Sequence, residues 1–128
     1  MWKVNKSSYS ILVVDDEPDI VELARRLLEM ENYRVIVAYD GEEALDKVNS
    51  EKIDLILLDI RIPKINGYEI CKIIKDEFGK KIKIIMFTVK VKEKDRRKSV
   101  KVGADDYFIK PFNGESLINV INKYLDDK

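Results

Sequence analysis

The residues most able to do chemistry in this sequence lie where short apolar segments end. They are three carboxylates, one hydroxyl and one ammonium group: Asp15, Asp16, Asp59, Thr88 and Lys110. In open parallel sheets, ligands bind outside the carboxyl ends of the strands. If the apolar segments are parallel strands, we therefore expect these five side chains to converge on one rim.

The charge of these groups predicts the kind of ligand. A dinucleotide or flavin site needs a glycine-rich or hydroxyl-rich turn after the first strand, with N–H groups facing phosphate. Here that turn is DDEP at 15–18, which would repel phosphate, and the sequence has no P-loop. Clustered carboxylates without histidine favour a hard cation, and Mg²⁺ fits best because it leaves waters for a substrate phosphate. With Lys110, the cation would keep Asp59 ionised, as an attacking nucleophile must be.

The elements that must position these groups alternate between strand and helix patterns. Largely β-branched apolar runs, typical of strands covered on both faces, occur at 11–14, 35–38, 55–58, 82–87 and 107–109. Amphipathic spacing predicts helices at about 18–28, 70–78 and 117–125, with weaker signals at 42–49 and 93–102. Asn113 is expected to cap the last of these. Five strands, each followed by a helix, predict an α/β sandwich with a parallel sheet.

The composition limits the class of protein. At 128 residues the chain is expected to form one domain, 10–128, after a loose or lightly docked extension, 1–9. Twenty-four basic and 24 acidic residues cancel, which argues against direct nucleic-acid binding. The lone Cys71 and the absence of an apolar signal or membrane segment predict a cytoplasmic protein. The 38% charged content, rich in Lys, Glu and Ile, fits either a thermophile or an AT-rich genome.

Four motifs at fixed separations resemble the receiver domain of two-component response regulators. They are ILVVDDEP at 11–18, LLDIRIP at 57–63 with Asn66-Gly67, FT at 87–88, and GADDYFIKPF at 103–112. The resemblance covers Ser10 to about Leu125 and implies a flavodoxin-like (βα)5 three-layer sandwich, with the parallel strands in the order 2-1-3-4-5.

The resemblance also implies a role for each acidic residue. Asp59 would accept a phosphoryl group from a phosphohistidine on a sensor histidine kinase or a histidine phosphotransfer protein. Asp16 and Asp59 would hold Mg²⁺ directly, Asp15 directly or through a water, and the backbone carbonyl of Arg61 would complete the protein ligands. The alternative for Asp15 and Asp16 is a helix N-cap, although one cap does not need two carboxylates.

Three further residues belong to the same implied mechanism. Lys110 would pair with Asp59 and then with a phosphoryl oxygen, and Thr88 would donate its hydroxyl to the bound phosphoryl group. Tyr107 lies where the family has its switch aromatic, which turns inward as Thr88 moves towards the phosphate. A buried core tyrosine is the alternative for Tyr107.

Some positions depart from the family pattern or flank the site. Val89 replaces a residue that is usually small, and we hypothesise that it slows attack of water on the acyl phosphate. Arg61 and Lys90 flank the same approach path and are further candidates for tuning that rate. Asn66 replaces a frequent aspartate before Gly67, which we interpret as a turn substitution of little consequence.

The segment 90–101 carries seven basic residues and two acidic ones. It is expected to form the fourth helix, part of the helix 4–strand 5–helix 5 face through which family members contact a downstream protein. It is either a solvated surface helix or a docking patch for an acidic partner.

The sequence therefore predicts a signalling switch that catalyses only its own phosphorylation and dephosphorylation. It would act through a partner, relay the phosphoryl group, or form the amino-terminal part of a longer regulator. A haloacid-dehalogenase-type phosphohydrolase is the first alternative, but that family places its two aspartates two residues apart after the first strand. The second alternative is a receiver-like module that only binds partners. Such a module would lack one of the acidic residues, Thr88 or Lys110, and this sequence has all of them.

Overall fold

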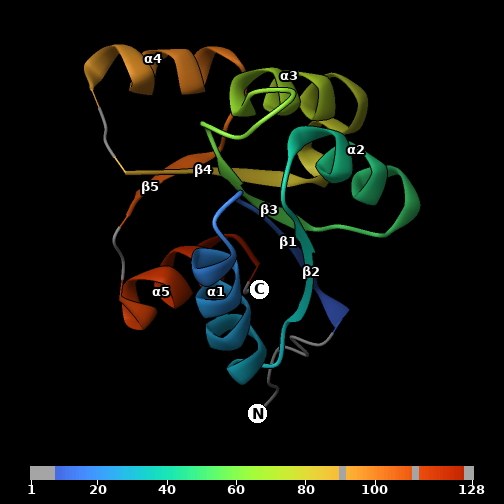
Figure 1. The fold of residues 1–128 in the computed structure, drawn as a ribbon, viewed down its shortest axis with the longest axis vertical. Coiled ribbons are helices and arrows are strands. Elements are labelled where there is room, and N and C mark those ends of the chain that lie inside the picture. Colours follow the sequence, from blue (N-terminus) through green and yellow to red (C-terminus); the bar gives the residue numbers. More distant parts are fainter. Residues whose placement is uncertain (1–7, 90–91, 111–112, 126–128) are drawn as a thin grey trace.

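The computed structural model describes residues 8–89, 92–110 and 113–125, and it shows a parallel sheet between two layers of helices (Figure 1). The strands are β1 (Ser10–Val14), β2 (Arg34–Ala38), β3 (Leu55–Asp59), β4 (Lys83–Thr88) and β5 (Asp106–Ile109). The helices are α1 (Pro18–Met30), α2 (Gly41–Ser50), α3 (Gly67–Phe78), α4 (Glu93–Lys101) and α5 (Gly114–Leu125), with a short 3₁₀ turn at Gly79–Lys81. The spatial order β2-β1-β3-β4-β5 confirms the predicted flavodoxin-like fold.

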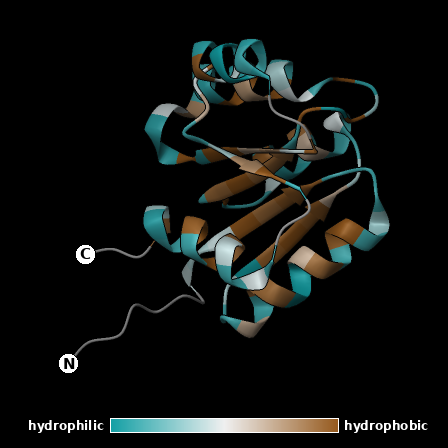
Figure 2. Ribbon diagram, turned by 90° about the vertical axis from the view of Figure 1, so that its left-hand side faces the viewer, coloured by the Kyte–Doolittle hydropathy of each residue, from teal (hydrophilic) through white to brown (hydrophobic). Residues whose placement is uncertain are grey.

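The central strands form because their apolar side chains are covered on both faces. All residues of β1 and β3 are buried, and they alternate between two separate cores. Leu12, Val14 and Leu58 face the core beneath α2 and α3, while Val13 and Leu57 face the core beneath α1 and α5. Figure 2 shows the resulting hydrophobic strands enclosed by helices in which hydrophilic and hydrophobic residues alternate. The carboxyl end of each strand is thereby fixed between two packed layers.

Local capping sets several helix starts. Asp40 accepts a hydrogen bond from the Glu43 N–H (2.8 Å) and begins α2, one of the two weakly predicted helices. Asn113 accepts from the Ser116 N–H (2.7 Å), as the sequence predicted for α5. Both weakly predicted helices, α2 and α4, are present in the structure.

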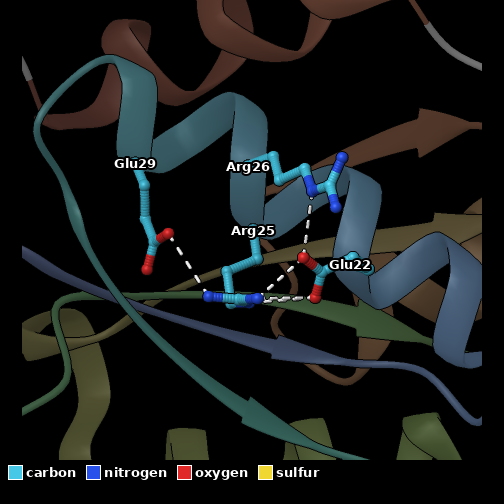
Figure 3. A network of polar contacts seen from close by, with 4 residues as sticks. All are labelled: Glu22, Arg25, Arg26 and Glu29. Atoms are coloured by element: carbon cyan, nitrogen blue, oxygen red, sulfur yellow. Dashed lines mark hydrogen bonds and ion pairs between the residues drawn. The ribbon is translucent and has the colours of Figure 1, made fainter.

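The outer face of α1 carries a chain of ion pairs (Figure 3). Glu22 contacts Arg25 at 2.6 Å and Arg26 at 3.0 Å, and Arg25 also contacts Glu29 at 3.4 Å. These residues are three or four positions apart on one helix, so the network stabilises α1 itself and does not tie it to a neighbour.

Residues 1–7 of the predicted extension lie outside the described residues. Its last residue, Tyr9, packs against the α1–α5 core, and its carbonyl accepts a hydrogen bond from the Arg34 N–H at 3.1 Å. Within the described ranges, no helix is both long and apolar enough to cross a membrane.

Candidate functional site

The polar groups at the strand ends meet at one edge of the sheet, as the sequence predicted. Asp15 follows β1, Asp59 and Thr88 are the last residues of β3 and β4, and Lys110 follows β5. All four are buried, with exposed fractions of 0% for Asp15, 6% for Asp59 and 5% for both Thr88 and Lys110. Buried polar side chains at the end of a largely apolar sheet need partners, and here Lys110 pairs with both Asp15 and Asp59.

The three carboxylates form a group that could hold a metal ion. Oxygen atoms of Asp15, Asp16 and Asp59 lie within 4.8 Å of one another, and Asp16 is exposed beside its two buried neighbours. An all-oxygen donor set without histidine or cysteine suits a hard divalent cation. The donor chemistry therefore fits the magnesium that the sequence predicted.

The turn after β1 does not serve to cap α1. Glu17 occupies the N-cap position, and its side chain makes no capping hydrogen bond. Asp15 Oδ1 instead accepts from the Glu17 N–H at 3.0 Å, which fixes the carboxylate at the floor of the site. The capping alternative for Asp15 and Asp16 is therefore excluded.

The ammonium group of Lys110 offsets the negative charge of the buried acids. Its Nζ lies 2.5 Å from Asp15 Oδ2, 3.5 Å from Asp59 Oδ2 and 3.7 Å from Glu17 Oε1. The Lys110 N–H donates to the Thr88 carbonyl at 2.7 Å, which fixes the backbone from which the side chain extends. Burial alone would lower the pKa of Lys110, but the hydrogen bond to Asp15 and the charge of Asp59 raise it. The ammonium group is thus charged at neutral pH.

The pKa of Asp59 lies closer to neutral pH than that of an ordinary aspartate. Burial, and then the charge of Asp15, raise its pKa from 3.8 to about 6, against the opposing effects of Lys110 and of the Arg61 N–H. That N–H donates to Asp59 Oδ1 at 3.2 Å. A cation bound by the carboxylates would favour the ionised form further.

A small cavity of about 150 Å³ opens above these groups. Its lining combines acids, bases, a hydroxyl and one exposed apolar side chain: Asp16, Glu17, Asp59, Arg61, Thr88, Val89 and Lys110. A second cavity of about 280 Å³ adjoins it and shares Arg61 and Thr88 in its lining. The first cavity is of a size to admit a small anion between the carboxylates and the two cationic side chains.

The remaining predicted residues are placed as follows. Val89, 64% exposed, lies at the cavity mouth, whereas Lys90 lies outside the described residues. Tyr107 does not line this cavity, because it packs into the core beneath α2 and α3. The hydroxyl of Tyr107 is buried and has no hydrogen-bond partner among the described residues. The roles of Val89, Lys90, Tyr107 and the Arg61 carbonyl stay predictions.

The structural roles of two residues near the site, Glu17 and Asn66, were not predicted from the sequence. Glu17 lines the cavity and contacts Lys110. Asn66 is the N-cap of α3 and accepts from the Glu69 N–H at 3.0 Å, a role that an aspartate at this position would fill equally well. The preference of asparagine for N-cap positions, directly before an amphipathic pattern, was the signal that could have identified it.

Comparison with known proteins agrees with this geometry. The family model of the response regulator receiver domain matches residues 11–122. The chain is 48% identical over 103 residues to the alkaline phosphatase synthesis transcriptional regulatory protein PhoP of Bacillus subtilis, covering 80% of this chain and 42% of PhoP. It is 44% identical over 115 residues to the transcriptional regulatory protein CpxR of Escherichia coli, covering 90% of this chain and 48% of CpxR. The chain thus spans less than half the length of these two relatives.

Solved structures show the same fold. A CheY-like receiver domain protein from Methanospirillum hungatei has a TM-score of 0.87 at 33% identity, covering 92% of this chain and 94% of that one. The BeF3-activated receiver domain of DrrB, a Thermotoga maritima response regulator, has a TM-score of 0.85 at 32% identity, covering 93% and 98%. With an acidic pocket at the carboxyl edge of a sheet in the order 2-1-3-4-5, the chain belongs to the receiver domain family of two-component response regulators.

Proposed function

We propose that Asp59 accepts a phosphoryl group from a phosphohistidine, with Mg²⁺ bound by the carboxylate cluster, and that phosphorylation switches the conformation of the output face formed by α4, β5 and α5. The observation that carries this proposal is the position of Asp59. Its buried carboxylate lies 3.5 Å from the Lys110 ammonium group and opens on a cavity that a phosphoryl group would fit. Receiver domains of response regulators are phosphorylated by histidine kinases, and the specific donor of this chain is a sensor kinase or a phosphotransfer protein.

The chemical step is a displacement at phosphorus. An oxygen of Asp59 forms the new bond to phosphorus as the bond from phosphorus to the donor's imidazole nitrogen breaks. The bonding electron pair stays on that nitrogen, which takes a proton from solvent. Such transfers proceed through loose transition states, so the protein contributes mainly by positioning groups and neutralising charge.

The charges around Asp59 suit this task. Asp15, Asp16, Asp59 and the Arg61 carbonyl would hold the Mg²⁺, which neutralises charge on the phosphoryl oxygens when bound. Lys110 would contact another phosphoryl oxygen, because its ammonium group already faces the acceptor carboxylate. The Thr88 hydroxyl lines the same cavity and would donate to a phosphoryl oxygen once the group is transferred.

Return to the unmodified state requires water to attack the acyl phosphate, releasing inorganic phosphate and the Asp59 carboxylate. Val89 and Arg61 line the cavity through which that water must pass, and Lys90 follows Val89 directly. A Val89→Ala variant should therefore lose phosphate faster than the parent. The chain would catalyse these two reactions on itself and no reaction of an outside substrate.

The output would pass through the face formed by α4, β5 and α5. On α4, exposed basic side chains surround Val100, which is 73% exposed, so an acidic surface on a downstream protein is the chemistry this face would suit. Tyr107, at the centre of β5, is the proposed switch aromatic. We place the protein in the cytoplasm, where two-component phosphotransfer operates.

The proposal is tested by incubating the chain with acetyl phosphate and Mg²⁺ and measuring its intact mass. The expected result is the addition of one phosphoryl group, which is lost in Asp59→Asn and in the presence of a chelator. Asp76→Asn, which changes an exposed acid on α3, should be phosphorylated like the parent. A phosphoryl group retained in Asp59→Asn would contradict the assignment. Turnover of free phosphate esters would favour a hydrolase, and no addition at all would indicate an inert binding module.

A further inference from the structure

Helix α4 is held to the rest of the domain by few contacts. Of its nine residues only Ser99 is buried, and its one large apolar side chain, Val100, is exposed. An element with little buried apolar surface is poorly anchored. The side chains that do hold α4 therefore decide how easily it moves.

Tyr68, the second residue of α3, supplies such an anchor. The Nζ atom of Lys98 lies over the Tyr68 ring, 4.5 Å from its centroid, and the Tyr68 hydroxyl donates to Asp95 Oδ1 at 3.4 Å. Asp95 is in the first turn of α4 and Lys98 in the second. One half-buried aromatic side chain thus holds the first two turns of α4 beside α3 (Figure 1).

The start of α3, which carries Tyr68, packs against the backbone of Asp59, the proposed phosphoacceptor. Gly67 precedes Tyr68, and a Cβ atom at Gly67 would lie 2.6 Å from the Asp59 carbonyl oxygen, so α3 begins in direct contact with the Asp59 backbone. The Gly67 N–H also donates to the Ile60 carbonyl at 2.9 Å. A displacement of the end of β3 therefore reaches the backbone of Tyr68 through a close packing contact and a hydrogen bond.

Space for a rearrangement lies beside Tyr68. The cavity of about 280 Å³ is lined by the loop after β3, the end of β4 and the first two turns of α4: Ile60, Arg61, Asn66, Tyr68, Thr88, Asp95 and Lys98. Thr88 lines both this cavity and the one above Asp59. A movement of Thr88 towards Asp59 would therefore change the volume available to the Tyr68 ring and to α4.

Asp95 also connects Tyr68 with Tyr107. Burial raises the pKa of Tyr68 to about 12, and the charge of Asp95 is the next contribution. Burial and then Asp95 likewise raise the pKa of Tyr107, whose hydroxyl is buried without a partner among the described residues. The charge of one carboxylate on the first turn of α4 thus acts on two tyrosines from two other elements, and of these Tyr68 donates to it.

We infer that Tyr68 is a positioning residue of the switch: through Lys98 and Asp95 it transmits the phosphorylation of Asp59 to α4. This inference rests on the proposed function, because it assigns the route by which that phosphorylation reaches the output face. The position of Tyr68 near the start of α3 would not by itself indicate this role.

The test is to follow backbone amide chemical shifts of α4 while Mg²⁺ and beryllofluoride are added as a stable phosphoryl mimic. In the parent chain we expect the α4 signals to move. In Tyr68→Ala most of that movement should be lost, while signals around Asp59 still respond. Tyr68→Phe keeps the ring over Lys98 and should retain most of the movement. Because coupling is reciprocal, the beryllofluoride affinity of Tyr68→Ala should also differ from that of the parent by about two- to fivefold, the range expected for one exposed cation–π contact.

Two variants separate transmission from simple loss of structure. Lys98→Met leaves Tyr68 intact and should lose part of the α4 movement. Arg97→Gln removes a neighbouring exposed charge of α4 and should behave like the parent. Full α4 movement in Tyr68→Ala, with beryllofluoride bound, would overturn the inference and leave the proposed function standing. Failure of the parent to bind beryllofluoride would overturn both.

Discussion

Helices α1 and α4 flank the same site, but they are held to the domain in opposite ways. Helix α1 buries Val21, Ala24 and Leu28 against the sheet, and its outer face carries the ion pairs of Figure 3. Helix α4 buries only Ser99, and its one large apolar side chain, Val100, is exposed. One helix is part of the permanent core, and the other is attached to its surface.

This difference indicates where a local charge change can have an effect. A charge change at Asp59 supplies only a few kcal/mol, which is small against a fully packed helix and comparable to the contacts that hold a surface helix. Switching therefore requires a rigid side that keeps the site geometry and a weakly held side that responds. The α1–α5 core provides the first, and α4 with its anchor Tyr68 provides the second.

The largest expected effect is a loss of stability when the buried face of α1 is truncated. Leu28 is fully buried beneath α1, so Leu28→Ala should lower the free energy of unfolding by about 2–5 kcal/mol. Val100→Ala, on the exposed face of α4, should change it by less than about 0.5 kcal/mol. Urea unfolding of both variants measures the contrast. Similar losses in the two variants would show that α4 is anchored as firmly as α1.

An intermediate effect concerns the site between the two helices. The pKa of Asp59 is raised from 3.8 to about 6, so the folded state binds the proton more tightly than the unfolded state does. Stability should therefore fall as the pH rises from about 4 to about 6, by roughly 3 kcal/mol in total. Asp59→Asn should remove this fall and be the more stable protein at pH 7 by up to that amount.

Thermal unfolding of the parent and of Asp59→Asn across this pH range measures the difference. Mg²⁺ should narrow it at pH 7, because a cation stabilises the ionised carboxylate. If the stability of the two proteins changed with pH in the same way, the ionised Asp59 carboxylate would not destabilise the folded state.

The smallest expected effect concerns the ion pairs on α1. Glu22→Gln removes the centre of the network in Figure 3, yet all four side chains are largely solvated, and exposed pairs contribute little. The melting temperature should stay close to that of the parent, and the small difference should disappear at high salt. A large, salt-independent loss would show that the network, and not the buried face, secures α1.

The sequence predicted the fold and the gathering of polar groups at the carboxyl edge of the sheet for a common reason. Asp59 and Lys110 each end a short apolar run, and the alternation of elements requires those ends to share one edge. The anchor of α4 could not be predicted in this way. Tyr68 and Lys98 are thirty positions apart and belong to different helices, so no local spacing relates them, and Lys98 alone resembles any other solvated lysine. The contacts of Glu17 likewise depend on tertiary packing, as does the burial of the Tyr107 hydroxyl without a partner among the described residues.

Hydrogen exchange of the whole chain, before and after phosphorylation by acetyl phosphate, tests the central claim most directly. The account predicts altered exchange in the amides of α4 and unchanged exchange in those of α1, and in Asp59→Asn the change in α4 should be absent. Phosphorylation of Asp59 that leaves α4 unchanged, or that alters α1 as much as α4, would contradict it.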